Sequence, residues 1–103
     1  MENLKISKKE LEAIHLIGQG FESKIYLFED VVFKIFSDSI LQNKDKLKSK
    51  KNKIIELNSV KDDITPKIFS LLYDDKGNFI GYSMEYIQKL YDFEQIFKDS
   101  RID

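Results

Sequence analysis

The chain has 103 residues, of which 42% are hydrophobic and 34% are charged, and its formal net charge is −1. This length allows one domain with a modest core, and the composition is that of a soluble globular protein. The small net charge excludes a general attraction to nucleic acids or membrane surfaces. The lack of cysteine excludes disulfides and thiolate metal sites, and the single histidine, His15, excludes a histidine metal cluster within the chain.

The N-terminal residues 1–10 are polar and charged, so we expect them to form an extension outside the domain. They lack the apolar core of a signal peptide, and no stretch of the chain is long and apolar enough for a membrane span. The expected location is therefore the cytoplasm, without a membrane partner.

Three strands are predicted in the first third of the chain. Residues 11–18 alternate loosely and lead into a glycine-rich turn, and residues 24–28 form a second β-rich run. Residues 31–36 are nearly all apolar, as expected of a strand that is covered on both faces. Glu29 and Asp30 predict a two-residue reversal between the second and third strands, although the usual glycine is missing.

Two features of these strands suggest an anionic ligand. Gly18 and Gly20 allow the backbone conformations that are barred to other residues, and they allow a close approach to a phosphate. Lys34 follows an apolar run, where its ammonium group needs an anionic partner to stay charged. Each feature alone is common in hairpin turns or on strand surfaces, so the nucleotide hypothesis depends on their occurring together.

A long helix is predicted over residues 41–60, which lack glycine and proline and follow N-cap residues at 37–39. Its apolar residues keep roughly to one face and are Leu47, Ile54, Leu57 and Val60. The lysines on the rest of its surface are Lys44, Lys46, Lys48, Lys50, Lys51 and Lys53. Because no aromatic residues interleave with them, we interpret these lysines as a solvated helix face rather than a nucleic-acid interface.

The second half of the chain predicts a hairpin. Pro66 favours an extended start, and residues 67–73 and 78–84 form two β-rich runs. Gly77 can supply the left-handed conformation of the turn between them. A short connector at residues 85–89 follows.

Asp92 and Gln95 resemble a capping pair and predict a short last helix. The predicted order is then three strands, one long helix, two strands, a connector and a short helix. We therefore predict an α+β fold, in which one long helix packs on a five-stranded antiparallel sheet.

This order resembles the N-terminal, ATP-binding lobe of the protein-kinase family. The glycine-rich loop of that family has the pattern G-x-G-x-x-G-x-V, and its lysine motif is V-A-I-K. Residues 18–25 match the loop, with Ser23 in place of the third glycine and Ile25 in place of the valine. Residues 31–34 match the lysine motif, with Val32 bulkier than the usual alanine.

The resemblance divides the chain into three parts. Residues 11–88 correspond to the kinase N-terminal lobe, with residues 1–10 before it, and residues 89–103 are the exit from the hinge and the short helix. The second, catalytic lobe of the family is absent from this sequence.

Residues 84–87 resemble the kinase hinge. The resemblance implies that Met84 is the gatekeeper at the back of an adenine pocket. The carbonyl group of Glu85 and the amide of Ile87 would then meet the adenine edge. Three apolar residues would cover the faces of the adenine, namely Ile17, Ile25 and Val32. Whether they line an adenine pocket or only the core of the sheet, these apolar side chains would be buried.

In the kinase family a helix glutamate pairs with the strand lysine and aims it at the ATP phosphates. Glu56 is the glutamate that we assign to this role with Lys34. An alternative alignment of the apolar residues puts Lys53 at that position, in which case the usual ion pair is missing. The catalytic aspartate and the metal-binding residues belong to the second lobe, so no catalytic residue is expected here, and Mg²⁺ is expected only with that lobe.

The predicted function is an ATP-binding lobe of a protein-kinase-like phosphotransferase that is not catalytically competent alone. One alternative is a non-catalytic half-kinase module that binds a partner protein, such as a kinase C-terminal lobe. Another is the N-terminal lobe of a small-molecule kinase of the aminoglycoside or choline type, which the short link between residues 28 and 31 also resembles. No nucleic-acid partner is expected.

Overall fold

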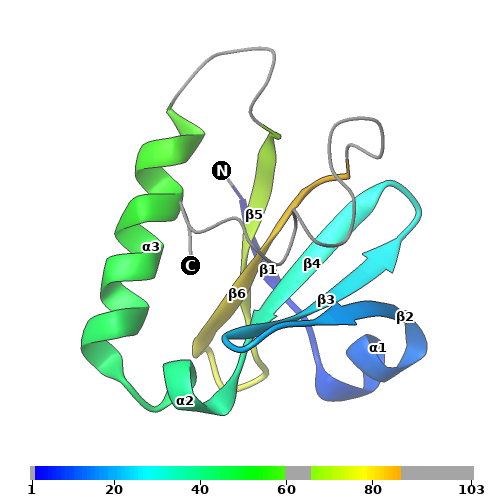
Figure 1. Cartoon of the computed structure of the whole chain (residues 1–103), viewed down its shortest axis with the longest axis horizontal. Coiled ribbons are helices and arrows are strands. Elements are labelled where there is room, and N and C mark those ends of the chain that lie inside the picture. The colour runs from blue at the N-terminus through cyan, green and yellow to red at the C-terminus, as the bar shows by residue number, and fades with distance from the viewer. Residues whose placement is uncertain (1, 60–65, 87–103) are drawn as a thin grey trace.

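The central feature of the protein is a single six-stranded sheet with the strand order β1-β5-β6-β4-β3-β2 (Figure 1). The computed structural model describes residues 2–59 and 66–86. In chain order, the elements are β1 (Glu2–Lys5), α1 (Lys8–Ala13), β2 (His15–Gln19), β3 (Ser23–Phe28), β4 (Val31–Phe36), α2 (Asp38–Leu41), α3 (Lys44–Asn58), β5 (Ile68–Tyr73) and β6 (Phe79–Glu85). The fold is α+β, as predicted.

The predicted meander is present in β2, β3 and β4, which pair antiparallel in that order. The reversal at residues 29–30 is also confirmed, and Glu29 adopts a φ of 56° in the position that glycine usually takes. β6 pairs antiparallel with both β4 and β5, so the second predicted hairpin joins the same sheet.

The prediction of five antiparallel strands is wrong at the N-terminus. Residues that were expected to lie outside the domain form β1, which pairs parallel with β5, so the sheet is mixed. Ile6 extends this edge because its amide donates to the carbonyl of Tyr73 at 2.8 Å. All four residues of β1 are exposed, so this edge strand lacks the alternating apolar pattern that reveals most strands in a sequence.

The helix α1 is a second correction, because residues 11–18 were predicted as a continuous strand. Ser7 and Glu10 form a capping box with two hydrogen bonds of 3.1 Å, and this starts a helix that ends at Ala13. The buried side chain of Leu11 then packs on the sheet. The cluster that it joins contains Ile6, Leu11, Leu72 and Ile80.

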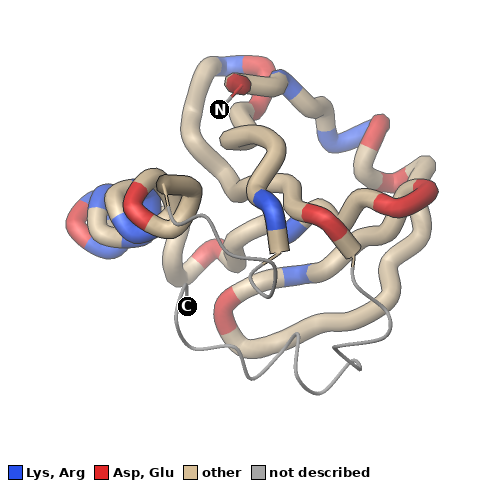
Figure 2. Tube along the Cα trace, turned by 90° about the horizontal axis from the view of Figure 1, so that it is seen from above, with Lys and Arg blue, Asp and Glu red and all other residues tan. Residues whose placement is uncertain are grey.

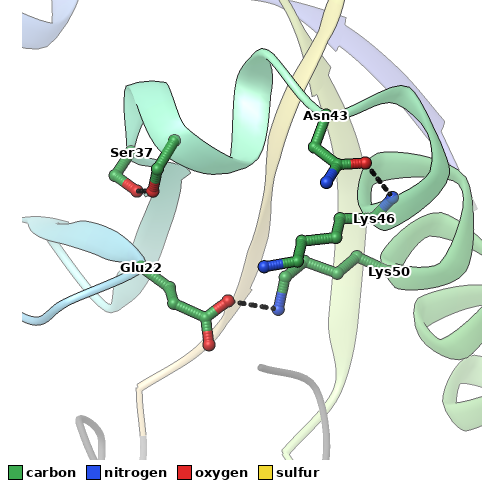
Figure 3. Close-up of polar contacts among 6 residues, drawn as sticks. Glu22, Ser37, Asn43, Lys46 and Lys50 are labelled. Carbon is green, nitrogen blue, oxygen red and sulfur yellow. Dashed lines mark hydrogen bonds and ion pairs between the residues drawn. The ribbon is translucent and has the colours of Figure 1, made fainter.

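The helix predicted over residues 41–60 begins later than expected, and residues 38–41, at the predicted cap, form the separate short helix α2. Asn43 begins α3, because its side chain accepts a hydrogen bond from the amide of Lys46 at 3.1 Å (Figure 3). The preceding turn, α2, buries Ile40. An asparagine in a helical pattern can therefore end one helix and start the next.

The helix α3 packs on the sheet face opposite to the Leu11 cluster, and we call this side the α3 face. Its core consists of Phe36, Ile40, Ile54, Ile68, Leu71 and Tyr82. The helix has few apolar residues, and Figure 2 shows that its surface carries both basic and acidic residues.

Two lysines of α3 contribute to its packing and correct the interpretation of a fully solvated lysine face. Lys50 is buried and Lys51 is half-buried. The ammonium of Lys51 lies 5.7 Å from the ring centre of Tyr73 and 6.0 Å from that of Phe79. Lysine stems and cation–π contacts thus replace part of the missing apolar surface of the helix.

The β5–β6 hairpin closes through Asp74 and Gly77. Gly77 has a φ of 83°, which confirms the predicted left-handed turn residue. The carboxylate of Asp74 accepts hydrogen bonds from the amides of Asn78 at 2.8 Å and Lys76 at 2.9 Å. These bonds, the one from the Asn78 amide above all, hold the pKa of Asp74 below its ordinary value.

Asp74→Ala should lower the free energy of unfolding near neutral pH by about 0.5–1 kcal/mol, because it removes hydrogen bonds that stabilise an exposed turn. Since the pKa of Asp74 is lower in the folded state than in the unfolded state, its contribution is complete above the unfolded value of about 3.9. The contribution disappears as the pH falls through the folded value. Urea unfolding of both proteins from pH 6 to pH 2.5 would show the two stabilities converging in acid. A constant difference across this range would contradict the assignment.

The predicted connector beyond residue 86, the short last helix and Val60 lie outside the described residues. Within residues 2–59 and 66–86, no helix has the length and apolar character needed to span a membrane.

Candidate functional site

The sheet register brings several predicted site residues into one row. Gly18 on β2 lies opposite Ile25 on β3, Ile25 lies opposite Lys34 on β4, and Lys34 lies opposite Tyr82 on β6. Because cross-strand partners share a face, this row runs along the α3 face. The glycine turn, an apolar side chain and the lysine are thus neighbours in space as well as in sequence order.

A second row supplies the apolar residues predicted to contact adenine. Val32 on β4 lies opposite Met84 on β6, and both residues are on the α3 face because they are two positions from Lys34 and Tyr82. Ile25 and Val32 are each 1% exposed. Met84 is partly buried and packs against the α3-face core. Ile17 is half-buried on β2, at the irregularity in register between Leu16 and Gly18.

The glycine turn connects β2 to β3 through a narrow reversal. The amide of Gly20 donates to the carbonyl of Ser23 at 2.8 Å, and Ser23 is buried. Phe21 at the tip is 95% exposed. Of the described glycines, only Gly77 has a positive φ, so Gly18 and Gly20 do not adopt the left-handed conformation that we expected of them. Their remaining contribution is the absence of a side chain.

Lys34 is 3% exposed, and its ammonium lies 5.9 Å from the ring centre of Tyr82. This aromatic face is a favourable neighbour for a buried cation. The strand that carries Lys34 is held close to β6 by Gly81, because a β-carbon at that position would overlap the carbonyl oxygen of Lys34. Gly81 was not predicted as a site residue, because nothing in the sequence distinguishes it from other glycines within strands.

Glu56, the predicted partner of Lys34, lies on the exposed face of α3. A shallow surface hollow of about 370 Å³ on that side is lined by Asp45, Lys48, Ser49, Asn52, Lys53 and Glu56. Residues two positions apart on a helix point in nearly opposite directions, so Glu56 points away from the sheet while Ile54 packs on it. Among the described residues, no ion pair joins Glu56 to Lys34. Lys53, the alternative, is exposed on the same outer face.

The buried charged residue of α3 is Lys50, which faces the sheet together with Ile54. Its ammonium lies 3.3 Å from a carboxylate oxygen of Glu22, in the glycine turn (Figure 3). It also lies 5.8 Å from the ring centre of Phe36. The Lys50 side chain is 8% exposed and the Glu22 side chain is 36% exposed. Helix periodicity was an available signal, because Lys50 lies three positions after Leu47 and four before Ile54.

The hinge region is anchored through its backbone. The amide of Glu85 donates to the carbonyl of Lys67 at 2.8 Å, and the amide of Tyr86 donates to the carbonyl of Asp30 at 3.1 Å. The first bond ties the end of β6 to the start of β5, and the second ties it to the turn between β3 and β4. Ile87, whose amide was predicted to meet adenine, lies outside the described residues.

No protein-family model matches the sequence, and no curated protein matches it significantly. The protein is therefore described by its fold and by the residues of the candidate site. It is an α+β domain in which a glycine turn and two buried lysines lie on one face of a mixed sheet.

Gly81→Ala should destabilise the protein by about 1–3 kcal/mol, because β6 must move away from the Lys34 carbonyl to make room for the methyl group. Gly77→Ala is a suitable comparison, since that site has open space and a positive φ, and it should cost about 1–2 kcal/mol. Urea unfolding measures both changes. The two variants should differ in their effect on the site, because only Gly81→Ala should alter the amide resonances of β4. Unchanged β4 resonances in a folded Gly81→Ala protein would contradict the proposed spacing role.

Proposed function

We propose that this chain is the nucleotide-binding half of a kinase-like phosphotransferase, and that ATP binds against the α3 face of its sheet. The observation that supports this most strongly is the row of Gly18, Ile25 and Lys34 across three adjacent strands. A turn with two glycines, an apolar floor and a buried ammonium suit a triphosphate joined to an aromatic base.

The adenine would lie at the apolar end of this surface. Ile25, Val32 and Met84 share the α3 face there, and Ile17 lies on the adjoining edge strand. Adenine has a flat apolar surface and a polar edge, so it needs side chains above and below and main-chain groups at its rim. The backbone groups of Glu85 and Ile87 are the proposed rim.

The phosphates would lie toward Lys34 and the glycine turn. A charge in a buried site interacts more strongly with an opposite charge than it does in bulk water, so one ammonium there can contribute substantially to phosphate binding. The role of this chain is then to bind and orient the nucleotide. The base that activates the acceptor and the groups that coordinate Mg²⁺ would come from a second lobe, which would also select a protein or small-molecule acceptor.

Lys34→Met tests the assignment. The wild-type protein should show a higher melting temperature at millimolar ATP, and Lys34→Met should bind ATP at least about tenfold more weakly, because a charged hydrogen bond contributes about 1.5–3 kcal/mol. Thermal melts and calorimetric titration with ATP measure both effects.

Lys24→Met is the matched control. Lys24 is exposed on β3 next to Ile25, so it belongs to the opposite face of the sheet, and its replacement removes the same charge. ATP binding should be nearly unchanged in this control. Equal weakening by both substitutions would indicate general electrostatic attraction, and no binding by the wild-type protein would overturn the proposed function.

A further inference from the structure

The helix α3 presents a cation to the site where the resemblance to kinases led us to expect a carboxylate. Lys50 faces the sheet from the middle of α3, and its ammonium is paired with Glu22 at 3.3 Å. Lys46, one turn earlier on the helix, extends in the same direction (Figure 3). In the kinase arrangement expected above, the helix supplies the anion of the ion pair. Here the helix supplies the cation, Lys50, and the glycine turn supplies the anion, Glu22.

Lys50 and Lys34 each lie near one ring of the same aromatic pair, Phe36 and Tyr82. The ammonium of Lys50 is 5.8 Å from the ring centre of Phe36, and that of Lys34 is 5.9 Å from the ring centre of Tyr82. The two ring centres are 6.2 Å apart. Both cations therefore contact the same aromatic pair on the α3 face.

The two members of the Glu22–Lys50 pair differ in their freedom to move. The Lys50 side chain is 8% exposed, whereas that of Glu22 is 36% exposed. The backbone of Glu22 is fixed, because its carbonyl accepts a hydrogen bond from the amide of Ser37 at 2.7 Å. The carboxylate can thus turn toward water without a change in the turn itself, while Lys50 stays where it is.

A buried ammonium is stabilised by a neighbouring anion, so another anion can take the place of the Glu22 carboxylate beside Lys50. A phosphate group is the natural replacement, because it carries more charge than a carboxylate and accepts more hydrogen bonds. The glycine turn that carries Glu22 is also the turn proposed to cover the phosphates.

We infer that Lys50 is a second phosphate-binding residue and that the carboxylate of Glu22 competes with phosphate for it. This inference rests on the proposed function, and the ligand class is the terminal phosphates of a nucleoside triphosphate. Glu22 thereby weakens nucleotide binding. Because only the terminal phosphates compete with it for Lys50, its effect depends on the number of phosphates in the nucleotide. The competition is built into one chain and needs no regulatory partner.

Calorimetric titrations with ATP, AMP and inorganic tripolyphosphate test the competition. Glu22→Gln should bind ATP and tripolyphosphate about tenfold more tightly than the wild-type protein, because it removes the carboxylate that competes for Lys50. A tenfold change in affinity corresponds to about 1.4 kcal/mol. AMP binding should change little. Lys50→Met should weaken ATP and tripolyphosphate binding about tenfold or more, and Lys50→Arg should retain most of it.

Two controls isolate the site from general charge effects. Glu12→Gln removes an exposed carboxylate on α1, and Lys48→Met removes an exposed ammonium on the outer face of α3. Neither should change tripolyphosphate affinity appreciably. Thermal melts of each variant show that it is folded, and the tighter binding expected of Glu22→Gln keeps the test valid if Lys50→Met does not fold.

The outcomes separate this inference from the proposed function. If ATP binds and Lys34→Met weakens it, but Glu22→Gln and Lys50→Met both bind ATP and tripolyphosphate as the wild-type protein does, the inference is overturned and the proposed function stands. If neither the wild-type protein nor Glu22→Gln binds ATP, both are overturned. Tighter binding of ATP and tripolyphosphate, but not of AMP, by Glu22→Gln supports the competition directly.

Discussion

The arrangement of the α3 face depends on a buried ammonium that must have an anion. Lys50 is almost fully buried under α3, and Glu22 of the glycine turn meets it at 3.3 Å. Ile54 and two flanking leucines supply most of the apolar packing of this helix, so the ion pair is a major link between the helix and the sheet. The same contact joins the helix to the glycine turn. Any ligand on the α3 face must share the space that this pair defines.

The N-terminal elements extend the sheet and cover part of the face opposite to α3. β1 extends the sheet beyond β5, and α1 covers the opposite face through Leu11. A hollow of about 330 Å³ remains on that side between α1 and the strands, with a largely apolar lining that includes Phe28 and Phe33. Lys34 and Lys50 both lie on the α3 face, so the two buried lysines are on the side opposite to this hollow.

The parts of the fold that could be predicted from the sequence are those set by local patterns. The meander and both hairpin turns follow from β-rich runs and short turns, and the row from Gly18 to Lys34 follows from that meander. β1 could not be recognised because both of its faces are exposed, and the break at Asn43 depends on a single cap. The pairing of Lys50 with Glu22 joins segments far apart in the chain, so no local pattern announces it.

The most direct test of a phosphate site on the α3 face is a map of backbone amide chemical shifts during titration with ATP. The largest changes should fall in the glycine turn at residues 18–23, at Lys34 and around Lys50, with smaller changes at Met84. The hollow beside Phe28 and Phe33 should be unaffected. Changes that gather around that hollow, or no changes at millimolar ATP, would contradict a nucleotide site between the sheet and α3.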